Sequence, residues 1–307
     1  LHGNNKSEEE IAFALEQGVG RIIVDSFDEI NRIEAACVAG GHRASVLVRV
    51  TTGVEAHTHE YIATAHEDQK FGLSIMGGQA LTALVRCHAS QYLDLRGIHS
   101  HIGSQIFETF GFEVAIRRTL KLASQFRTAT GVELPELDLG GGFGISYTSA
   151  DSPLGATDLA AAFEEMIDHE CRAFGLSRPH LSIEPGRAIC GPAGVAIYLV
   201  GTIKLVELEG GRSRLYVSVD GGMSDNIRPA LYAAEYSGTV ANRTSAQPPV
   251  LSRVVGKHCE GGDILIRDVF LPADIAIGDL IAVPGSGAYA RSMASNYNQV
   301  PKPPVVS

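Results

Sequence analysis

The chain has 307 residues, of which 45% are apolar and 20% are charged, so it can bury the core of one large domain or two moderate ones. Its 25 Lys and Arg residues against 35 Asp and Glu residues give a net charge of −10, which argues against general binding to nucleic acid or an anionic membrane. No stretch reaches the roughly 18 consecutive apolar residues of a membrane span. The five cysteines are widely spaced and form neither C-x-x-C nor a zinc-ligand pattern, so we expect a cytoplasmic protein without disulfides or a metal site.

Strands and helices alternate along the first part of the chain. Ser7 followed by Glu10, and Ser26 followed by Glu29, each predict a helix start, because the side chains of such a capping box satisfy free backbone N–H groups. Gly40 marks the end of the second helix. Apolar periodicity predicts the other elements in chain order: strand 22–24, strand 46–50, helix 79–88, strand 95–101, helix 112–130, strand 135–139, helix 159–174 and strand 181–184.

This alternation implies right-handed crossovers and a parallel sheet, which both an open doubly wound sheet and a closed barrel satisfy. The run Gly140–Gly144 lacks the G-x-G-x-x-G spacing of the open dinucleotide-binding fold. Asp25, His101, Gly140 and Glu184 stand at or just after the carboxyl ends of successive predicted strands. Because barrel enzymes build their sites on that face, we expect an α/β fold with a TIM-type (β/α)8 barrel.

After Gly191 the helical periodicity weakens, and strands are expected at 195–207, 215–219, 263–269 and 280–283. We therefore predict a barrel domain over 1–195 and a mostly β domain over 196–307. The sequence opens at Leu1 without Met and stops at Ser307, and both ends look cut inside secondary structure. We expect the first domain to be incomplete at its N-terminus and the second at its C-terminus.

Two motifs at predicted strand ends suit an anionic ligand. The run Gly140–Gly142 lets backbone N–H groups approach a phosphate, although a tight turn needs the same residues. Glu184 can face a cationic ring nitrogen, and Arg187 can pair with a phosphate or carboxylate, although the two side chains can also form an ion pair that closes a loop.

Further candidates have equally plain structural alternatives. His101 can stack on a flat cofactor and Ser104 can bind a phosphate, whereas a lone histidine is more often a satisfied core group. Cys259 stands beside a basic pair and can act as an acid, whereas an isolated cysteine is more often a small buried apolar group. The glycine-rich loops before Arg228 and Tyr289 can be simple turns.

The combination of motifs is far more specific than any single one. Their order is H-x-G-S-Q from His101, D-L-G-G-G-F from Asp138, E-P-G-R from Glu184, D-G-G-x-x-D from Asp220, C-E-x-G-D from Cys259 and G-A-Y ending at Tyr289. With H-G-N-N-K-S from His2, this order resembles the fold-type III pyridoxal-phosphate decarboxylases of basic amino acids, and among them the diaminopimelate decarboxylases, over essentially the whole chain.

The resemblance implies a (β/α)8 barrel followed by a β domain, pyridoxal 5′-phosphate as cofactor, and a homodimer with the active site shared across its interface. It places His101 against the pyridine ring and Glu184 at the ring nitrogen. The residues that it implies for the cofactor phosphate are Ser104, Gly141, Gly142, Gly186 and Arg187.

The resemblance also implies a substrate site. Arg187, Arg228 and Tyr232 would receive the distal carboxylate of the substrate, and Tyr289 would touch both cofactor and substrate. Glu260 would face the distal ammonium, and a glutamate at this position favours diaminopimelate over ornithine. Cys259 would reach across the dimer interface and protonate the carbon that has lost carbon dioxide.

One departure concerns the lysine that forms the Schiff base in this family, which lies on the first barrel strand. None of the six lysines of this sequence sits in an apolar strand at that place; they are Lys6, Lys70, Lys121, Lys204, Lys257 and Lys302. We expect that lysine and the first two barrel strands to lie upstream, and this chain alone to be inactive.

The leading hypothesis is therefore decarboxylation of meso-2,6-diaminopimelate to L-lysine. A related decarboxylase acting on ornithine, arginine or carboxynorspermidine stays open. So does a non-catalytic regulator of the same fold, which the missing lysine would favour and the intact Cys259–Glu260 motif opposes.

Overall fold

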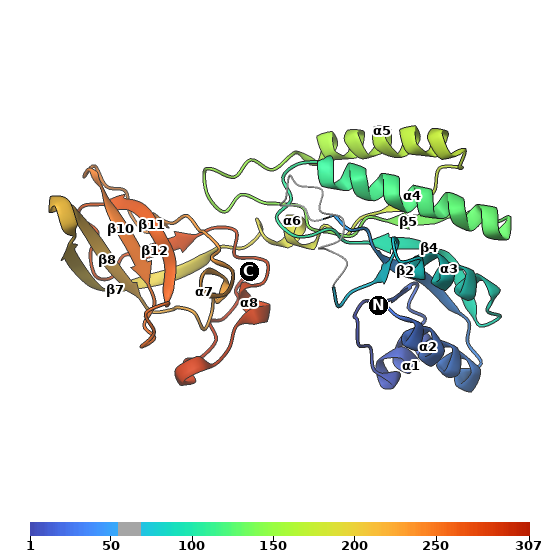
Figure 1. The fold of residues 1–307 in the computed structure, drawn as a ribbon. Coiled ribbons are helices and arrows are strands. Elements are labelled where there is room, and N and C mark those ends of the chain that lie inside the picture. The colour runs from blue at the N-terminus through green and yellow to red at the C-terminus, as the bar shows by residue number, and fades with distance from the viewer. Residues whose placement is uncertain (55–68) are drawn as a thin grey trace. The chain divides into compact units, whose positions relative to one another are not determined.

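The computed structural model describes residues 1–54 and 69–307. Within these ranges the chain forms two compact units (Figure 1). Unit 1 comprises residues 1–143 and 154–185, and unit 2 comprises residues 144–153 and 186–307. The domain boundary predicted at residues 195 and 196 stays a prediction.

Unit 1 is built on a parallel sheet. Its central path runs β1-β2-β4-β5-β6, and β3 pairs with the end of β2. Every strand pair in this sheet is parallel, and the strands follow the path in chain order, as in a (β/α) barrel. The strands are β1 (Ile22–Val24), β2 (Ala44–Thr51), β3 (Leu73–Ser74), β4 (Leu93–Ser100), β5 (Glu136–Asp138) and β6 (His180–Ser182).

Helix α1 precedes β1, and helices α2 to α5 separate β1 from β2, β3 from β4, β4 from β5 and β5 from β6. Each buries one apolar face. Helix α4 buries Ile116, Leu120 and Phe126, and it lies beside α5, as α1 lies beside α2 (Figure 1). The ring of Phe112 in α4 stacks on Phe143, with centroids 5.2 Å apart, which anchors the loop that follows β5. The helices are α1 (Glu8–Glu16), α2 (Phe27–Gly40), α3 (Gln79–Ala89), α4 (Phe110–Thr130) and α5 (Ala156–Phe174).

The predicted polar strand ends are confirmed. Asp25 follows β1, His101 follows β4, Gly140 comes two residues after β5, and Glu184 comes two residues after β6. Because the strands are parallel, their carboxyl ends lie on one edge of the sheet. Unit 1 therefore gathers these four positions on one edge, and its α/β class agrees with the prediction.

Unit 2 is mostly β, which confirms the predicted class of the second part. Its sheet has the order β11-β10-β8-β7-β12-β9, in which only β8 and β10 pair in parallel. Its core includes Tyr147, Tyr198 and Tyr236 among aliphatic side chains. The strands are β7 (Ala196–Glu207), β8 (Ser213–Val219), β9 (Thr239–Val240), β10 (Pro249–Val255), β11 (Ile264–Pro272) and β12 (Leu280–Val283). Sequence analysis missed β9 and β10.

Unit 2 also contains three short helices: α6 (Gly186–Cys190) before β7, α7 (Arg228–Tyr232) between β8 and β9, and α8 (Ala290–Met293) after β12. It has 3-10 turns at Glu209–Gly211 and Tyr297–Gln299. None of the helices in the described residues is both long and apolar enough to cross a membrane. All five cysteines are free; Cys37, Cys87 and Cys171 are buried, and Cys190 and Cys259 are exposed.

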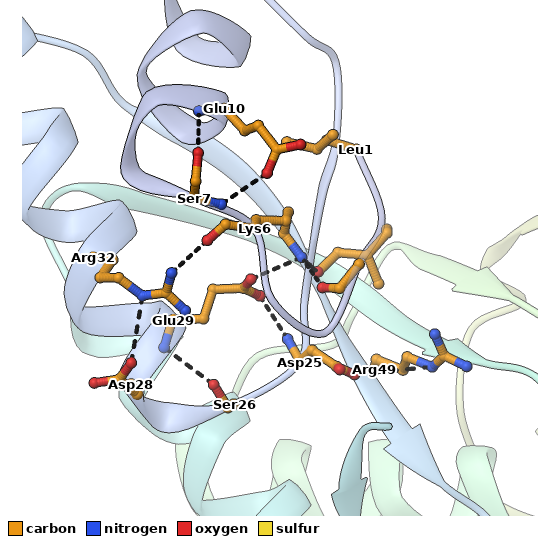
Figure 2. A network of polar contacts seen from close by, with 12 residues as sticks. Leu1, Lys6, Ser7, Glu10, Asp25, Ser26, Asp28, Glu29, Arg32 and Arg49 are labelled. Atoms are coloured by element: carbon orange, nitrogen blue, oxygen red, sulfur yellow. Dashed lines mark hydrogen bonds and ion pairs between the residues drawn. The ribbon is translucent and has the colours of Figure 1, made fainter. Parts of the chain in front are cut away.

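A buried ion pair joins Lys6, near the start of the chain, to helix α2 (Figure 2). The Lys6 ammonium lies 2.8 Å from Glu29 Oε1 and donates to the backbone carbonyls of Gly3 and Ile23, so three acceptors surround its three N–H donors. The side chains of Lys6 and Glu29 are 2% and 1% exposed. This lysine is therefore fully engaged in holding α1 and α2 to β1.

The same ion pair changes the predicted caps. Ser7 and Glu10 form the complete capping box, as expected. Ser26 accepts the Glu29 backbone N–H, but the Glu29 side chain accepts from the Asp25 N–H and pairs with Lys6 instead of returning to Ser26. The second capping box is thus only half formed, because a buried cation takes the carboxylate.

Replacing Lys6 by Met should destabilise the fold by about 3–5 kcal/mol, because it leaves the Glu29 carboxylate buried without its partner. The double variant Lys6→Met with Glu29→Leu should recover most of that loss. Denaturant unfolding of both variants measures the effect. Lys121→Met, at an exposed position of α4, is the control, and an equal midpoint for Lys6→Met and Lys121→Met would contradict the assignment.

Candidate functional site

Three strand-end loops of unit 1 meet at the run Gly140–Gly142. A Cβ on Gly141 would lie 2.4 Å from the carbonyl oxygen of Glu184, and one on Gly142 would lie 2.2 Å from that of Gly103. Real Cβ atoms do not approach oxygen this closely, so only glycine lets these backbones touch. The run therefore holds the loops after β4 and β6 in contact with the loop after β5.

His101 is fixed by this contact. The backbone N–H of Gly141 donates to His101 Nδ1 at 3.2 Å. Neighbouring atoms remove solvent from around the His101 ring, and this desolvation lowers its pKa; the positive charge of Arg49 lowers it further. Part of the residue is still exposed. A neutral ring that accepts at Nδ1 carries its proton on Nε2. The structure thus presents a flat, uncharged imidazole at the strand ends.

Two imidazoles approach the Glu184 carboxylate. Glu184 Oε1 lies 2.9 Å from His2 Nε2 and 3.4 Å from His99 Nε2. Burial works to raise the pKa of Glu184, but hydrogen bonds and charge from His2 and His99 outweigh it and hold that pKa well below its usual range. Glu184 is therefore an ionised carboxylate that can pair with a protonated ring nitrogen.

Two buried side chains at the end of β4 carry a polar atom without a hydrogen-bond partner among the described residues. They are His99, through Nδ1, since its Nε2 faces Glu184, and Ser100, through its hydroxyl; both side chains are at most 1% exposed. Buried polar atoms are normally paired. With the glycine run and the Glu184 carboxylate, they fit a flat cofactor that carries a phosphate and a ring nitrogen.

The same cluster also has donor groups that suit a metal ion. One ligand atom from each of His2, His99 and Glu184 lies within 4.8 Å of the others. The motif resemblance instead predicts that Glu184 pairs with a cofactor ring, and this role stays a prediction.

In unit 2, two arginines lie against tyrosine rings. The guanidinium carbon of Arg187 is 4.6 Å from the Tyr289 ring centroid, and that of Arg228 is 5.8 Å from the same centroid. Tyr289 has a backbone φ of 68°, which non-glycine residues rarely adopt and which often marks functional sites. The structure therefore brings together three of the predicted substrate residues.

Cys259 and Glu260 stand on an exposed loop between β10 and β11. Buried Asp263 fixes the base of this loop by accepting the backbone N–H groups of Met223 at 2.6 Å and His258 at 2.8 Å. Glu260 accepts a hydrogen bond from the Tyr297 hydroxyl. A thiol and a carboxylate are thus held at the surface on a loop with a rigid base.

The predicted site residues fall in both units. Unit 1 holds His101, Ser104, Gly141, Gly142 and Glu184, and of these His101, Gly141 and Glu184 are in direct contact. Unit 2 holds Gly186, Arg187, Arg228, Tyr232, Cys259, Glu260 and Tyr289. Tyr232, in the same short helix as Arg228, is 63% exposed. Their roles in binding stay predictions.

Sequence analysis missed several side chains that support these groups. His2 belongs to the H-G-N-N-K-S motif, but nothing local indicated that it would touch Glu184, which is far away in the chain. Tyr147, Tyr236 and Tyr297 stand outside the motifs. The alternation of His99 and His101 along one strand was the only available signal for His99.

Comparison with known proteins gives consistent matches. Residues 1–191 match the model of the pyridoxal-binding domain of pyridoxal-dependent decarboxylases. The chain is 51% identical over 311 aligned positions to diaminopimelate decarboxylase of Mycobacterium tuberculosis, covering 100% of this chain and 70% of that protein. For the Bacillus subtilis enzyme of the same name the identity is 47%, with 100% and 69% coverage. The crystal structure of M. jannaschii diaminopimelate decarboxylase with L-lysine superposes with a TM-score of 0.88 at 30% identity, covering 98% of this chain and 67% of that one.

Replacing His2 by Gln should raise the pKa of Glu184 toward its ordinary value of about 4.3, because His99 alone then opposes burial. A lowered folded-state pKa stabilises the fold above about pH 4, and this contribution is lost as the pH falls through the folded value. The variant should therefore lose less stability on acidification than the unmodified protein.

The carboxyl carbon-13 shift of Glu184, assigned with Glu184→Gln, measures this pKa in the cofactor-free protein. His169→Gln, at an exposed position of α5, is the control. An unchanged Glu184 titration in His2→Gln would refute the role of His2.

Proposed function

Because the chain belongs to the family of pyridoxal-dependent decarboxylases, we propose that it removes carbon dioxide from meso-2,6-diaminopimelate and forms L-lysine, the last step of lysine biosynthesis. The observation that carries this proposal is the 51% identity over the whole chain to a diaminopimelate decarboxylase. The presence of both basic groups, Arg187 and Arg228, and an acidic group, Glu260, in unit 2 supports it, because the far end of this substrate carries both a carboxylate and an ammonium group.

Pyridoxal 5′-phosphate is the cofactor. Its pyridinium ring, when bound, withdraws electrons from the carbon that loses carbon dioxide. The residues assigned to its phosphate are Ser104, Gly141, Gly142, Gly186 and Arg187. The neutral His101 imidazole covers a ring face without adding charge. Glu184, kept ionised by His2 and His99, holds the proton on the ring nitrogen.

The substrate is held from its far end. Arg187, Arg228 and Tyr232 bind the distal carboxylate, and Glu260 binds the distal ammonium. Cys259 delivers the proton from Sγ to the carbon that has lost carbon dioxide. Tyr289, whose ring lies against Arg187, contacts both cofactor and substrate.

We further propose a cytoplasmic homodimer in which Cys259 and Glu260 complete the site of the other copy. The two side chains are exposed on a loop that Asp263 pins, as expected of residues that serve a neighbouring chain. Because all five cysteines are free thiols, the structure is compatible with the reducing compartment that we propose.

The full-length protein should release carbon dioxide from meso-diaminopimelate much faster than from ornithine, arginine or carboxynorspermidine. Glu260→Gln should raise KM for diaminopimelate by about tenfold to a hundredfold, because a charge-assisted hydrogen bond contributes about 1.5–3 kcal/mol. Glu165→Gln, at an exposed position of α5, is the matched control. Preferred turnover of another basic amino acid would overturn the substrate assignment, and no turnover of any would overturn the function.

A further inference from the structure

Two arginines of unit 2 are held by tyrosine hydroxyls. Arg187 Nη1 donates to the Tyr147 hydroxyl at 2.6 Å, and Arg228 Nη1 donates to the Tyr236 hydroxyl at 2.5 Å. The Arg228 guanidinium carbon also lies 4.8 Å from the centroid of the Tyr147 ring. Tyr147 therefore contacts both arginines, one through its hydroxyl and the other through its ring face.

Arg228 is a buried cation for which the described part of the chain supplies no matching anion. It is only 7% exposed, and no carboxylate of the described residues forms an ion pair with it. Burial raises the pKa of Tyr236, and the nearby Arg228 charge offsets only part of this, so the phenol stays neutral and supplies no counter-charge. Because arginine stays protonated in proteins, this position favours an anionic ligand.

The Tyr147 backbone is anchored on both sides. Its N–H donates to Asp151 Oδ2 at 2.9 Å, and its carbonyl accepts from the backbone N–H and hydroxyl of Ser237 at 3.0 and 2.8 Å. A Cβ on Gly285 would lie 3.0 Å from the ring. The side chain, 5% exposed, has little freedom to move.

The two tyrosines also support each other. The rings of Tyr147 and Tyr236 meet edge to face, with centroids 5.0 Å apart and an interplanar angle of 73°. This is a favourable geometry for aromatic pairs. The hydroxyls of two packed, buried rings thus set the directions of two guanidinium groups.

We propose that Tyr147 and Tyr236 are positioning residues that orient Arg187 and Arg228 toward the distal carboxylate of the substrate. The inference rests on the proposed function, and it adds two residues outside the motifs that identified the site. A carboxylate is bound best when planar guanidinium donors are already aligned with it. A carboxylate would neutralise a guanidinium group, whereas a neutral hydroxyl aligns the group and leaves its positive charge available to the substrate.

The test compares Tyr147→Phe and Tyr236→Phe in the full-length protein loaded with cofactor. Each variant keeps the ring and removes only the hydroxyl. We expect the dissociation constant of L-lysine, measured by calorimetry, and KM for diaminopimelate to rise about tenfold or more, with kcat changed less than about twofold. Cadaverine, which is L-lysine without its carboxylate, should bind as it does to the unmodified protein.

Tyr216→Phe is the matched control, because Tyr216 in β8 accepts a hydrogen bond at 3.2 Å from Arg253 in β10, an arginine that we do not assign to the substrate site. If L-lysine binds both site variants as tightly as it binds Tyr216→Phe, the proposal is wrong. An equal loss for L-lysine and cadaverine would also overturn it, because the hydroxyls would then act through general structure. An unmodified protein that binds L-lysine but does not decarboxylate diaminopimelate would defeat the proposed function, while the binding comparison would still decide the role of the tyrosines.

Discussion

Direct contact between backbones at Gly140–Gly142 determines how the functional edge of unit 1 is built. No side chain fits between this run and the loops that follow β4 and β6. The same contact gives His101 its hydrogen bond from Gly141 and places the Glu184 backbone against the run. The stacking of Phe143 on Phe112 holds the end of the run to the helical layer. Sterics at three residues therefore set the positions of the imidazole and the carboxylate.

Two buried cations, Lys6 and Arg228, differ in the partners that the described residues give them. Lys6 has a buried carboxylate and two carbonyls around its ammonium, so its charge is already balanced within the fold. Arg228 rests on a phenol and an aromatic ring, and the described residues provide it with no carboxylate. Burial costs each cation its hydration. Glu29 offsets that cost for Lys6, whereas for Arg228 we propose that the carboxylate of the substrate does so.

The sequence predicted what depends on local patterns. Strand ends at Asp25, His101 and Glu184 follow from apolar runs that stop, and the box at Ser7 and Glu10 follows from spacing. These features need only neighbours along the chain, so periodicity and capping rules reach them. The parallel sheet follows in turn from the alternation of strands and helices.

Contacts across long stretches of chain were beyond those rules. His2 lies before β1 and Glu184 after β6, with β2, β4 and β5 between these strands in the sheet, so their contact depends on the whole sheet. Glu29 leaves its expected cap because Lys6 is buried beside it. Tyr147 follows the glycine run in sequence but packs in unit 2, where Ser237 anchors it. Such side chains carry no motif of their own, because their partners are chosen by tertiary packing.

The most direct test of this account is the affinity of the full-length Gly141→Ala variant for pyridoxal 5′-phosphate. An added Cβ would meet the Glu184 carbonyl at 2.4 Å. The backbone shifts that such overpacking forces cost about 1–3 kcal/mol. We predict a dissociation constant at least about tenfold above that of Gly20→Ala, where a Cβ meets nothing within 4 Å, with the circular dichroism spectrum retained. Equal affinity of the two variants would contradict the claim that the glycine run builds the cofactor site.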